Sequence, residues 1–434
     1  MEQLLEQAKK VSQEAEVFSV VHRETEASFE SNRLKLVQTK ESQGIALRLI
    51  KDGRIGFSAT SKPGNESELL EMALEMSPFG AEAKFEFPAK KDFAQIEIYD
   101  AEVEAVSEEA MVELGQSLID KIRAEFPELV CEATVSRNIF SVKIMNSRGG
   151  EATYQKSIFS ISVEGVLTRD TDMLFVGDFE SSCHPILSPE QVVQSTLEQL
   201  ERAKKTVPAP TGILPVLFTP HGVASALITP LTLAFNGKTV VRGASPLGNR
   251  IGEQVFASSL SIWDDPTIEF RPASRFCDDE GMPSQRTALV EKGVVANFLY
   301  DLQTAGQAGT KSTGSASRTL GSLPSPSISA LIIEEGEAGF EEMLAGIEEG
   351  LVIEQLMGAT QGNVLGGEFS GNVLLGYKVE KGEIVGRVKN TMVAGNVYQV
   401  LKEDIVVGNK SRWIGASLKT PAIYCPRVSV AAKG

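Results

Sequence analysis

The pattern of the chain changes at the segment Thr206-Val207-Pro208-Ala209-Pro210-Thr211-Gly212. Its two prolines and its glycine interrupt any regular element, so this segment is the best candidate for a domain boundary. Helical and alternating apolar stretches are mixed before it. After it, most of the chain consists of short strand patterns separated by Gly, Asn and Ser turns. The sequence therefore predicts an α+β fold, in which an α+β N-terminal region is followed by a mainly β C-terminal domain.

The elements expected on either side of this boundary follow from apolar periodicity. Before the boundary, the predicted helices are 1–14, 66–77, 105–125 and 188–205. The predicted strands there are 16–22, 26–39, 44–50, 54–60, 130–137, 140–147 and 152–168. Asp52-Gly53 is a hairpin turn signal, and the Phe/Lys/Pro-rich stretch 79–92 is a connection. Beyond the boundary we expect a strand at 213–219 and helices at 221–234 and near 338–350. The predicted regions are 1–97 (α+β), 98–206 (α+β) and 212–434 (mainly β).

The composition argues against several classes of protein. The chain of 434 residues has a formal charge of −16 and a sequence pI near 4.9. This charge repels nucleic-acid phosphates and anionic membranes, so we expect no direct nucleic-acid or membrane partner. No run approaches the ~18 apolar residues that span a bilayer, and the charged N-terminal helix is not a secretory signal. The cysteines form no Cys-x-x-Cys pair, which predicts a cytoplasmic protein with reduced thiols.

The histidines are too few and too scattered for a helical zinc motif. The chain has three, His22, His184 and His221, and no two are three or four residues apart. A zincin helix needs two imidazoles on one face and an adjacent carboxylate that polarises the bound water. Scattered histidines could share a metal only if the fold brought them together. Cys183 and His184 are adjacent, but neighbours on a strand point to opposite faces. We therefore predict neither a catalytic residue nor a metal site in this chain.

Other catalytic signatures are also missing. No Gly-x-Ser-x-Gly elbow occurs, and no serine is followed three residues later by lysine. Asn236-Gly237-Lys238-Thr239 resembles the end of a phosphate-binding loop, but Thr232 stands where the first glycine is required. Two acidic groups, Asp264-Asp265 and Asp278-Asp279-Glu280-Gly281, could ligate Mg²⁺ or Ca²⁺. Short acidic residues beside proline and glycine are also typical turn-formers, so both interpretations stay open.

Motifs in both halves make the chain resemble a known family. In the N-terminal part they are Gly44-Ile45-Ala46-Leu47-Arg48 and Asp52-Gly53-Arg54-Ile55-Gly56-Phe57. In the C-terminal part they are, in order, Ile251-Gly252-Glu253-Gln254-Val255, Asp264-Asp265-Pro266, Phe276 to Pro283, Gly293 to Asp301, Ser312 to Arg318, Phe369-Ser370-Gly371, Gly382 to Val385 and Ala394-Gly395-Asn396. This ordered series resembles the TldD/PmbA family, once described as modulators of DNA gyrase. It covers essentially the whole chain and is far more specific than any single motif.

The resemblance implies a choice between two branches. The TldD-type subunit carries a His-Glu-x-x-x-His motif and a late cysteine, and is a zinc-dependent peptidase acting on unfolded or modified peptides. The TldE/PmbA-type subunit lacks these ligands and completes a closed, hollow dimer around the site. Placed by Gly252-Glu253, the motif falls on residues 228–233 of this chain. Ile228 and Leu233 stand in place of the histidines, and Thr229 stands in place of the glutamate.

The late cysteine leads to the same branch. It would fall near Val407-Gly408, where the chain has none, and Cys425 is better interpreted as a buried structural thiol. The resemblance thus implies a TldE/PmbA-like, non-catalytic subunit of a zinc metallopeptidase, which forms part of a peptide chamber. No cofactor is expected in this chain, and zinc is expected in a TldD-type partner. The dimer could instead contain two copies of this chain.

Two segments are candidates for contact with peptide or partner. In the small polar loop Lys311–Arg318 these are Ser312, Thr313, Gly314 and Arg318, with Arg318 as a charge contact or as a plain salt bridge. The second is the glycine-rich stretch Gly358–Gly371, because small loops and strand edges bind extended peptides by strand addition. Two other functions stay open, a self-contained metal-dependent peptidase with a non-motif site and a homodimeric peptide-binding or scaffold protein. Any gyrase-related role would be indirect.

Overall fold

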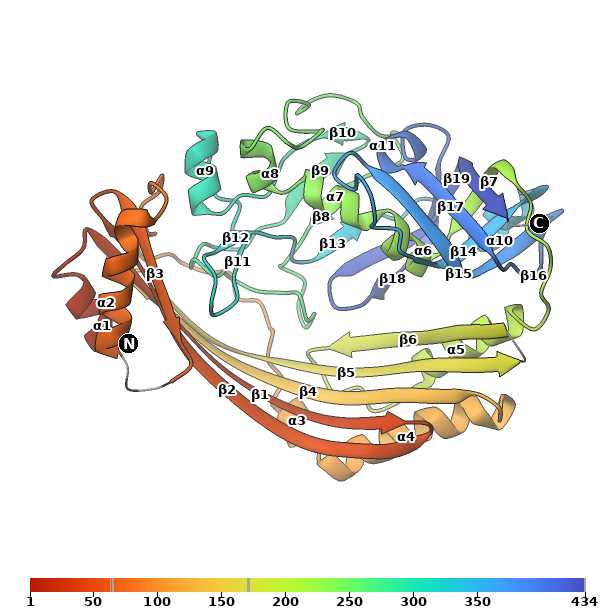
Figure 1. The fold of residues 1–434 in the computed structure, drawn as a ribbon, viewed down its shortest axis with the longest axis horizontal. Coiled ribbons are helices and arrows are strands. Elements are labelled where there is room, and N and C mark those ends of the chain that lie inside the picture. Colours follow the sequence, from red (N-terminus) through yellow and green to blue (C-terminus); the bar gives the residue numbers. More distant parts are fainter. Residues whose placement is uncertain (63, 65, 170–171, 433–434) are drawn as a thin grey trace.

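The N-terminal half of the chain forms a long, curved antiparallel sheet that lies beneath a mainly β C-terminal body (Figure 1). The computed structural model describes residues 1–62, 64, 66–169 and 172–432. The order of the strands across this sheet is β3-β2-β1-β4-β5-β6. Their bounds are β1 Glu14–Glu30, β2 Arg33–Lys51, β3 Arg54–Thr60, β4 Val130–Asn146, β5 Glu151–Arg169 and β6 Asp172–Ser182. Since β1 pairs with β4, the sheet crosses the predicted division between residues 97 and 98.

Helices cover the face of this sheet that points away from the C-terminal body. Helices α3 and α4 lie on that face, while α1 and α2 lie at the end of the sheet beside β3 (Figure 1). The helices of this half are α1 Glu2–Ala8, α2 Glu66–Met76, the 3₁₀ helix η1 Ser77–Phe79, α3 Ala101–Ala105, α4 Glu108–Glu125 and α5 Glu190–Arg202. In α4, Ser107 caps the N-terminus by accepting the Ala110 N–H, and Met111, Leu118 and Ile122 are buried on one side. This confirms the helix predicted there.

Turn chemistry explains which predicted strands are correct. The hairpin at Asp52-Gly53 is confirmed, with both residues at positive φ. The predicted strand 26–39 is wrong, because the chain reverses at Ser31-Asn32, again with both residues at positive φ. That turn contains neither glycine nor proline, so its signal is weak. The predicted break between 137 and 140 is also wrong, since β4 runs straight through Asn138.

The C-terminal body is built around strands that close into a ring. Strand β7 pairs with β14 on one side and with β19 on the other, and β15 and β17 complete the circuit. The long β19 reaches several partners because its pairing passes from β13 and β18 to β7 and β17 along its length. The strands are β7 Gly212–Phe218, β8 Ile262–Asp264, β9 Thr287–Glu291, β10 Val294–Val295, β11 Ala316–Ser317, β12 Ser325–Pro326, β13 Leu331–Ile333, β14 Glu349–Met357, β15 Glu368–Glu380, β16 Glu383–Arg387, β17 Thr391–Asn396, β18 Val406–Ile414 and β19 Leu418–Ala432.

The helices of the body are short. They are α6 Pro220–Ala226, α7 Ile228–Ala234, α8 Gly237–Val241, α9 Leu302–Ala308, α10 Phe340–Ala345 and α11 Val397–Val400. The helix predicted over 221–234 is therefore two helices that meet at Leu227, and the one predicted near 338–350 ends before β14 begins. Apolar side chains from the ring, including Phe218 and Phe369, pack with α6 and α7 in one core. The α+β class with a mainly β C-terminal domain is thus confirmed.

Two further findings concern exposure. Cys425 lies fully buried in β19, and burial raises the pKa of its thiol to about 12, as expected for a structural cysteine. None of the helices within the described residues combines the length and the apolar character needed to cross a bilayer.

Candidate functional site

A pocket of about 830 Å³ lies between the concave face of the sheet and the C-terminal body, and we call it the sheet–body pocket. On the sheet its lining includes Glu132, Ser162, Glu164, Val166, Phe175, Gly177, Asp178 and Phe179. On the body and α5 it includes Gln199, His221, Ala224, Ser225, Glu354, Gln355, Leu374 and Ile414. Its volume is in the range of small-molecule sites, and its walls mix aromatic and aliphatic groups with a few polar ones.

A charged cluster closes one end of this pocket. His221 Nε2 lies 3.0 Å from Asp178 Oδ1 of β6, and its Nδ1 lies 3.7 Å from Glu354 Oε2 of β14. Arg412 of β18 pairs with Asp178 at 2.6 Å, and Arg202 of α5 lies 3.6 Å from Glu354. These residues, Asp178, Arg202, His221, Glu354 and Arg412, form the His221 cluster. It joins the edge of the sheet to the body.

The first turn of α6 sets the position of His221. Thr219 directly follows β7, and its hydroxyl oxygen accepts the Gly222 N–H as an N-cap while donating to Glu354 Oε2 at 2.7 Å. Pro220 occupies the first helical turn, where its missing N–H is harmless. The sequence therefore fixes the imidazole at a strand-to-helix turn whose cap is tied to the same carboxylate.

The two carboxylates keep His221 positively charged. Burial alone would lower the pKa of the imidazole, but the hydrogen bond to Asp178 and the nearby carboxylate of Glu354 outweigh it and raise the pKa to about 9. Burial would raise the pKa of Asp178, yet His221 and Arg412 hold it below its usual value. An imidazole that is already protonated at neutral pH cannot act as a general base. The charge pairs of this cluster therefore hold the sheet and the body together.

Helix α7 carries the positions where a metal motif was expected by resemblance. Ile228 and Thr229 are half-buried, and Leu233 is 40% exposed. None of the three can supply an imidazole or a carboxylate to a metal. Across the described residues, His, Cys, Asp and Glu side chains form no group of three or more that could hold a metal ion.

The predicted glycine-rich stretch lies next to this helix. The Tyr398 hydroxyl lies 3.5 Å from the Pro230 carbonyl oxygen of α7 and 3.3 Å from the Leu365 carbonyl oxygen in that stretch. Asn396 Nδ2 donates to the Gly366 carbonyl at 2.7 Å. The structure thus brings together two elements that the sequence separates by more than a hundred residues, although it does not test their contact with peptide.

Comparisons with known proteins show the family of this chain. A family model described as the PmbA/TldA metallopeptidase C-terminal domain matches residues 211–432, and a model for domain 1 of the same group matches residues 15–77. The chain belongs to the PmbA/TldD family. An uncharacterized protein of Methanocaldococcus jannaschii is 28% identical over 93% of this chain and 94% of its own length. A metalloprotease of Methanothermobacter thermautotrophicus is 24% identical over 92% of this chain and 88% of its own length.

A solved structure shares the fold over the whole length. TldE from Thermococcus kodakarensis superimposes with a TM-score of 0.90 and covers 100% of both chains at 24% sequence identity. At this identity the match establishes the fold of the PmbA/TldD chain and no more.

In this PmbA/TldD chain the loop predicted to contact peptide is packed into the protein. The Arg318 side chain is 1% exposed, lies over the Phe18 ring and sits 2.8 Å from Glu16 Oε1, at an angle that is not that of a hydrogen bond. Gly314 has a φ of +67°, and a Cβ there would lie 2.2 Å from the Pro283 carbonyl oxygen. The Ser312 and Thr313 hydroxyls lie 3.2 Å from the Tyr300 carbonyl oxygen. Arg318 therefore forms a salt bridge, one of its two predicted roles, while contact of Ser312, Thr313 and Gly314 with peptide or partner stays a prediction.

Arg318 belongs to a second charged junction between sheet and body, the Arg48 cluster, formed by Glu16, Arg48, Glu280 and Arg318. Arg48 pairs with Glu16 at 3.1 Å and with Glu280 at 2.6 Å, and its guanidinium lies against the rings of Phe85 and Phe87. Burial would lower the pKa of Arg48, but the two glutamates outweigh it and raise it. The sequence offered no local signal for this cluster, because Arg48 and Glu280 are 232 positions apart.

The two acidic groups accept backbone N–H groups in different ways. Asp278 Oδ1 accepts the N–H groups of Glu280 and Met282, while its Oδ2 accepts the Ala316 N–H. Asp264 Oδ1 accepts two further backbone N–H groups, from Ser329 and Ala330. Asp278 thus forms a turn, as one of the two interpretations predicts, whereas the donors to Asp264 lie 65 and 66 positions away and form no turn with it.

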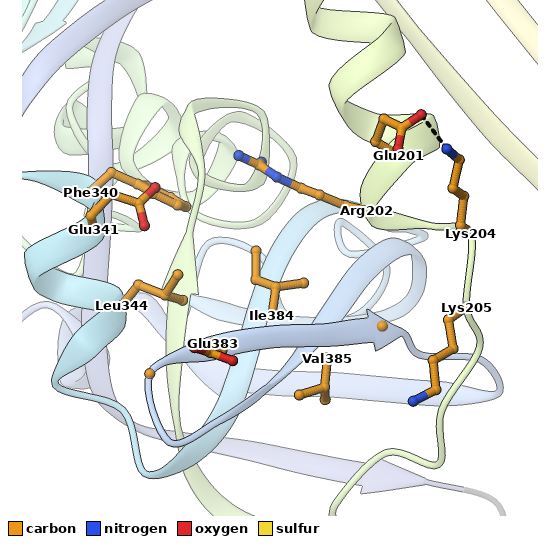
Figure 2. Close-up of a pocket in the computed structure, with 12 residues that line it drawn as sticks. Glu201, Arg202, Lys204, Lys205, Phe340, Glu341, Leu344, Glu383, Ile384 and Val385 are labelled. Atoms are coloured by element: carbon orange, nitrogen blue, oxygen red, sulfur yellow. Dashed lines mark ion pairs between the residues drawn. The ribbon is translucent and has the colours of Figure 1, made fainter. Parts of the chain in front are cut away.

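A second groove, of about 520 Å³, is lined by Arg202 of the His221 cluster and by Phe340, Leu344 and Ile384 (Figure 2). Arg202 extends from the end of α5 toward Phe340, and its guanidinium carbon is 5.7 Å from the ring centroid (Figure 2). Lys204 pairs with Glu201 at 2.5 Å beside it. Because three acidic and three basic residues line this groove, its charge favours no one class of ligand.

Proposed function

We propose that this chain is a TldE/PmbA-type, non-catalytic subunit of a metallopeptidase, and that its sheet–body pocket holds part of an unfolded or modified peptide. The observation that carries the proposal is the combination of α7 and the pocket. The helix has Ile228, Thr229 and Leu233 where zinc ligands and a base would stand, while a pocket of about 830 Å³ is already formed beside α6. A chain with a binding site but without catalytic groups fits a substrate-holding subunit. Zinc would then come from a TldD-type partner.

The pocket favours contacts through side chains over strand addition. The outer edge of β6 is capped at Gly177, because the Gln199 amide donates to the Gly177 carbonyl at 3.0 Å and accepts the Gly177 N–H at 2.9 Å. Arg387 donates to the Met173 carbonyl of the same edge at 2.8 Å. Side chains that pair a strand edge in this way block the addition of another strand. A peptide would therefore lie across the concave face, against Phe175 and Phe179.

Hydrolysis of an unstructured peptide tests the proposal. The chain is expected to be inert alone and to be needed for full activity when it is mixed with the His-Glu-x-x-x-His relative from the same organism, with a chelator control. Phe175→Ala, which removes part of the pocket wall, is expected to lower the activity of the mixture roughly tenfold, the effect of losing about 1.4 kcal/mol. Phe79→Ala is the matched control, because Phe79 is 84% exposed and does not line the pocket.

Two results would contradict the proposal. Chelator-sensitive cleavage by the chain alone would favour a self-contained peptidase with a metal site assembled by the fold. Peptide binding without any effect on the relative's activity would favour a homodimeric peptide-binding or scaffold protein.

A further inference from the structure

We propose that the sheet–body pocket recognises an aromatic side chain of the bound peptide, and that Phe175, Gly177 and Phe179 of β6 form the slot that holds it. This inference rests on the proposed function and names the class of peptide that its pocket accepts. Residues two apart on a strand share a face, so these three positions present a ring, bare backbone and a second ring in turn. All three line the pocket, and each is half-buried.

The spacing of the slot suits a ring. Neighbouring positions on one face of a strand are about 7 Å apart, so a ring held over Gly177 would lie at that distance from both phenylalanines. Favourable aromatic pairs have ring centroids about 4.5–7 Å apart. Within the described residues, neither Phe175 nor Phe179 has another ring as its partner. Both rings therefore remain available to a third ring from a ligand.

The floor of the slot needs no polar ligand. The N–H and the C=O of Gly177 are both hydrogen-bonded to the Gln199 amide, at 2.9 and 3.0 Å. A Cβ at Gly177 would lie 2.3 Å from the Val163 carbonyl oxygen, so no larger residue fits there unless β5 moves. The slot thus contains no side chain of its own, and its backbone groups are already satisfied.

The opposite wall and the charges of the pocket favour an apolar side chain over an acidic one. Ala224, Leu374 and Ile414 line the pocket from the body, and all three are half-buried. The carboxylates of the His221 cluster are already paired with its cations. Glu164, the register partner of Gly177, is exposed and would repel an acidic side chain placed in the slot. An aromatic side chain would instead gain free energy by burying its apolar surface between these walls.

Fluorescence anisotropy with three labelled probes tests the slot. The probes are one unstructured Gly/Ser peptide with phenylalanine, alanine or lysine at its centre. The phenylalanine peptide is expected to bind the purified full chain about 10-fold more tightly than either of the others. Phe175→Ala with Phe179→Ala should reduce this preference to about 2-fold or less, because both flanking rings are lost. Phe79→Ala, which truncates an 84% exposed ring outside the pocket, should preserve it.

A second variant separates loss of the ring from loss of the fold. Phe179→Leu keeps apolar bulk in the slot and removes only the ring, so it should weaken the preference for phenylalanine by about 3-fold. Thermal unfolding of this variant is expected to match that of the parent, since the position is half-buried. An unchanged preference in Phe179→Leu would overturn recognition through the aromatic rings.

The outcomes separate the two proposals. If all three peptides bind with equal affinity, aromatic recognition is wrong while the peptide-binding function stands. Binding of the lysine peptide as tightly as the phenylalanine peptide would also overturn it, because charge would then outweigh the rings. If none of the peptides binds, the proposed function itself fails. If the double variant keeps the full preference for phenylalanine, the assignment to Phe175 and Phe179 is wrong.

Discussion

The Arg48 cluster and the His221 cluster both join the sheet to the C-terminal body, but they are built in different ways. The Arg48 cluster is buried from solvent. Its Glu16 and Glu280 are fully buried, and the Arg48 side chain is only 3% exposed. The His221 cluster borders a pocket, and its histidine is 23% exposed. A cluster that is buried from solvent can only hold the sheet and the body together. A charged cluster beside a pocket can also contribute to a binding site.

Loss of Arg48 should have the greatest effect. Arg48→Met leaves Glu280 buried without its cation and Glu16 with Arg318 alone, and we expect a loss of about 3–5 kcal/mol in the free energy of unfolding. Chemical denaturation measures it. Arg33→Met, at an exposed position of β2, is the control and should change stability little. A loss below about 1 kcal/mol for Arg48→Met would show that the cluster is not the main contact that holds the sheet against the C-terminal body.

The contribution of the His221 cluster to the free energy of unfolding should depend on pH. The pKa of His221 is raised from its ordinary 6.5 to about 9 in the folded protein. The stabilisation from its charged form is therefore fully present below about pH 6.5 and is lost as the pH rises through about 9. We expect this loss to amount to about 2–3 kcal/mol and to vanish in His221→Gln. The measurement is the free energy of unfolding at several pH values, with His184→Gln as the control. If His221→Gln kept the same dependence of this free energy on pH, the assignment to His221 would be wrong.

Removing the cap on the edge of β6 should have a moderate effect. Gln199→Leu leaves the N–H and C=O of Gly177 without their side-chain partner, which should destabilise the protein by about 1–3 kcal/mol. The exchange of the Gly177 amide hydrogen should also become faster. Unchanged exchange at this position would mean that the edge is covered in some other way. Gln194→Leu, on the exposed side of α5, is the matched control.

The smallest effect should come from the acidic pair, and with the opposite sign. Glu132→Gln with Glu164→Gln removes a repulsion across two strands, so stability should rise by about 0.2–1 kcal/mol. Differential scanning calorimetry can resolve such a shift against Glu291→Gln. Marked destabilisation would mean that the two glutamates stabilise the sheet when no ligand is bound.

The sequence predicted the parts of the fold that have local signals. Asp52-Gly53 identified a hairpin because both residues tolerate positive φ, and the apolar spacing of α4 identified a helix packed on one side. The turn at Ser31-Asn32 was missed because it lacks glycine and proline. The break predicted near Asn138 is absent because pairing with β1 and β5 on both sides carries β4 through it.

The candidate site shows a sharper limit. The resemblance placed the degenerate motif on Ile228, Thr229 and Leu233, and the structure puts all three on α7. The pocket could not be predicted, since Glu164, His221 and Glu354 meet only through tertiary packing. Arg318 was assigned to a polar loop, yet its partner Glu16 lies in β1, about three hundred positions away. Pairings over such distances leave no spacing pattern in a single sequence.

Photo-crosslinking of a bound peptide is the most direct test of the difference between the two junctions. An unstructured, lysine-containing peptide with a benzophenone side chain would be irradiated with the protein, and the cross-linked segments would be identified by mass spectrometry. We expect cross-links on residues 162–166, 175–179, 221, 224 and 225, which line the sheet–body pocket. Cross-links confined to residues 312–318, beside the Arg48 cluster, would contradict this account. They would place the peptide at the cluster to which we assign only the role of holding the sheet and the body together.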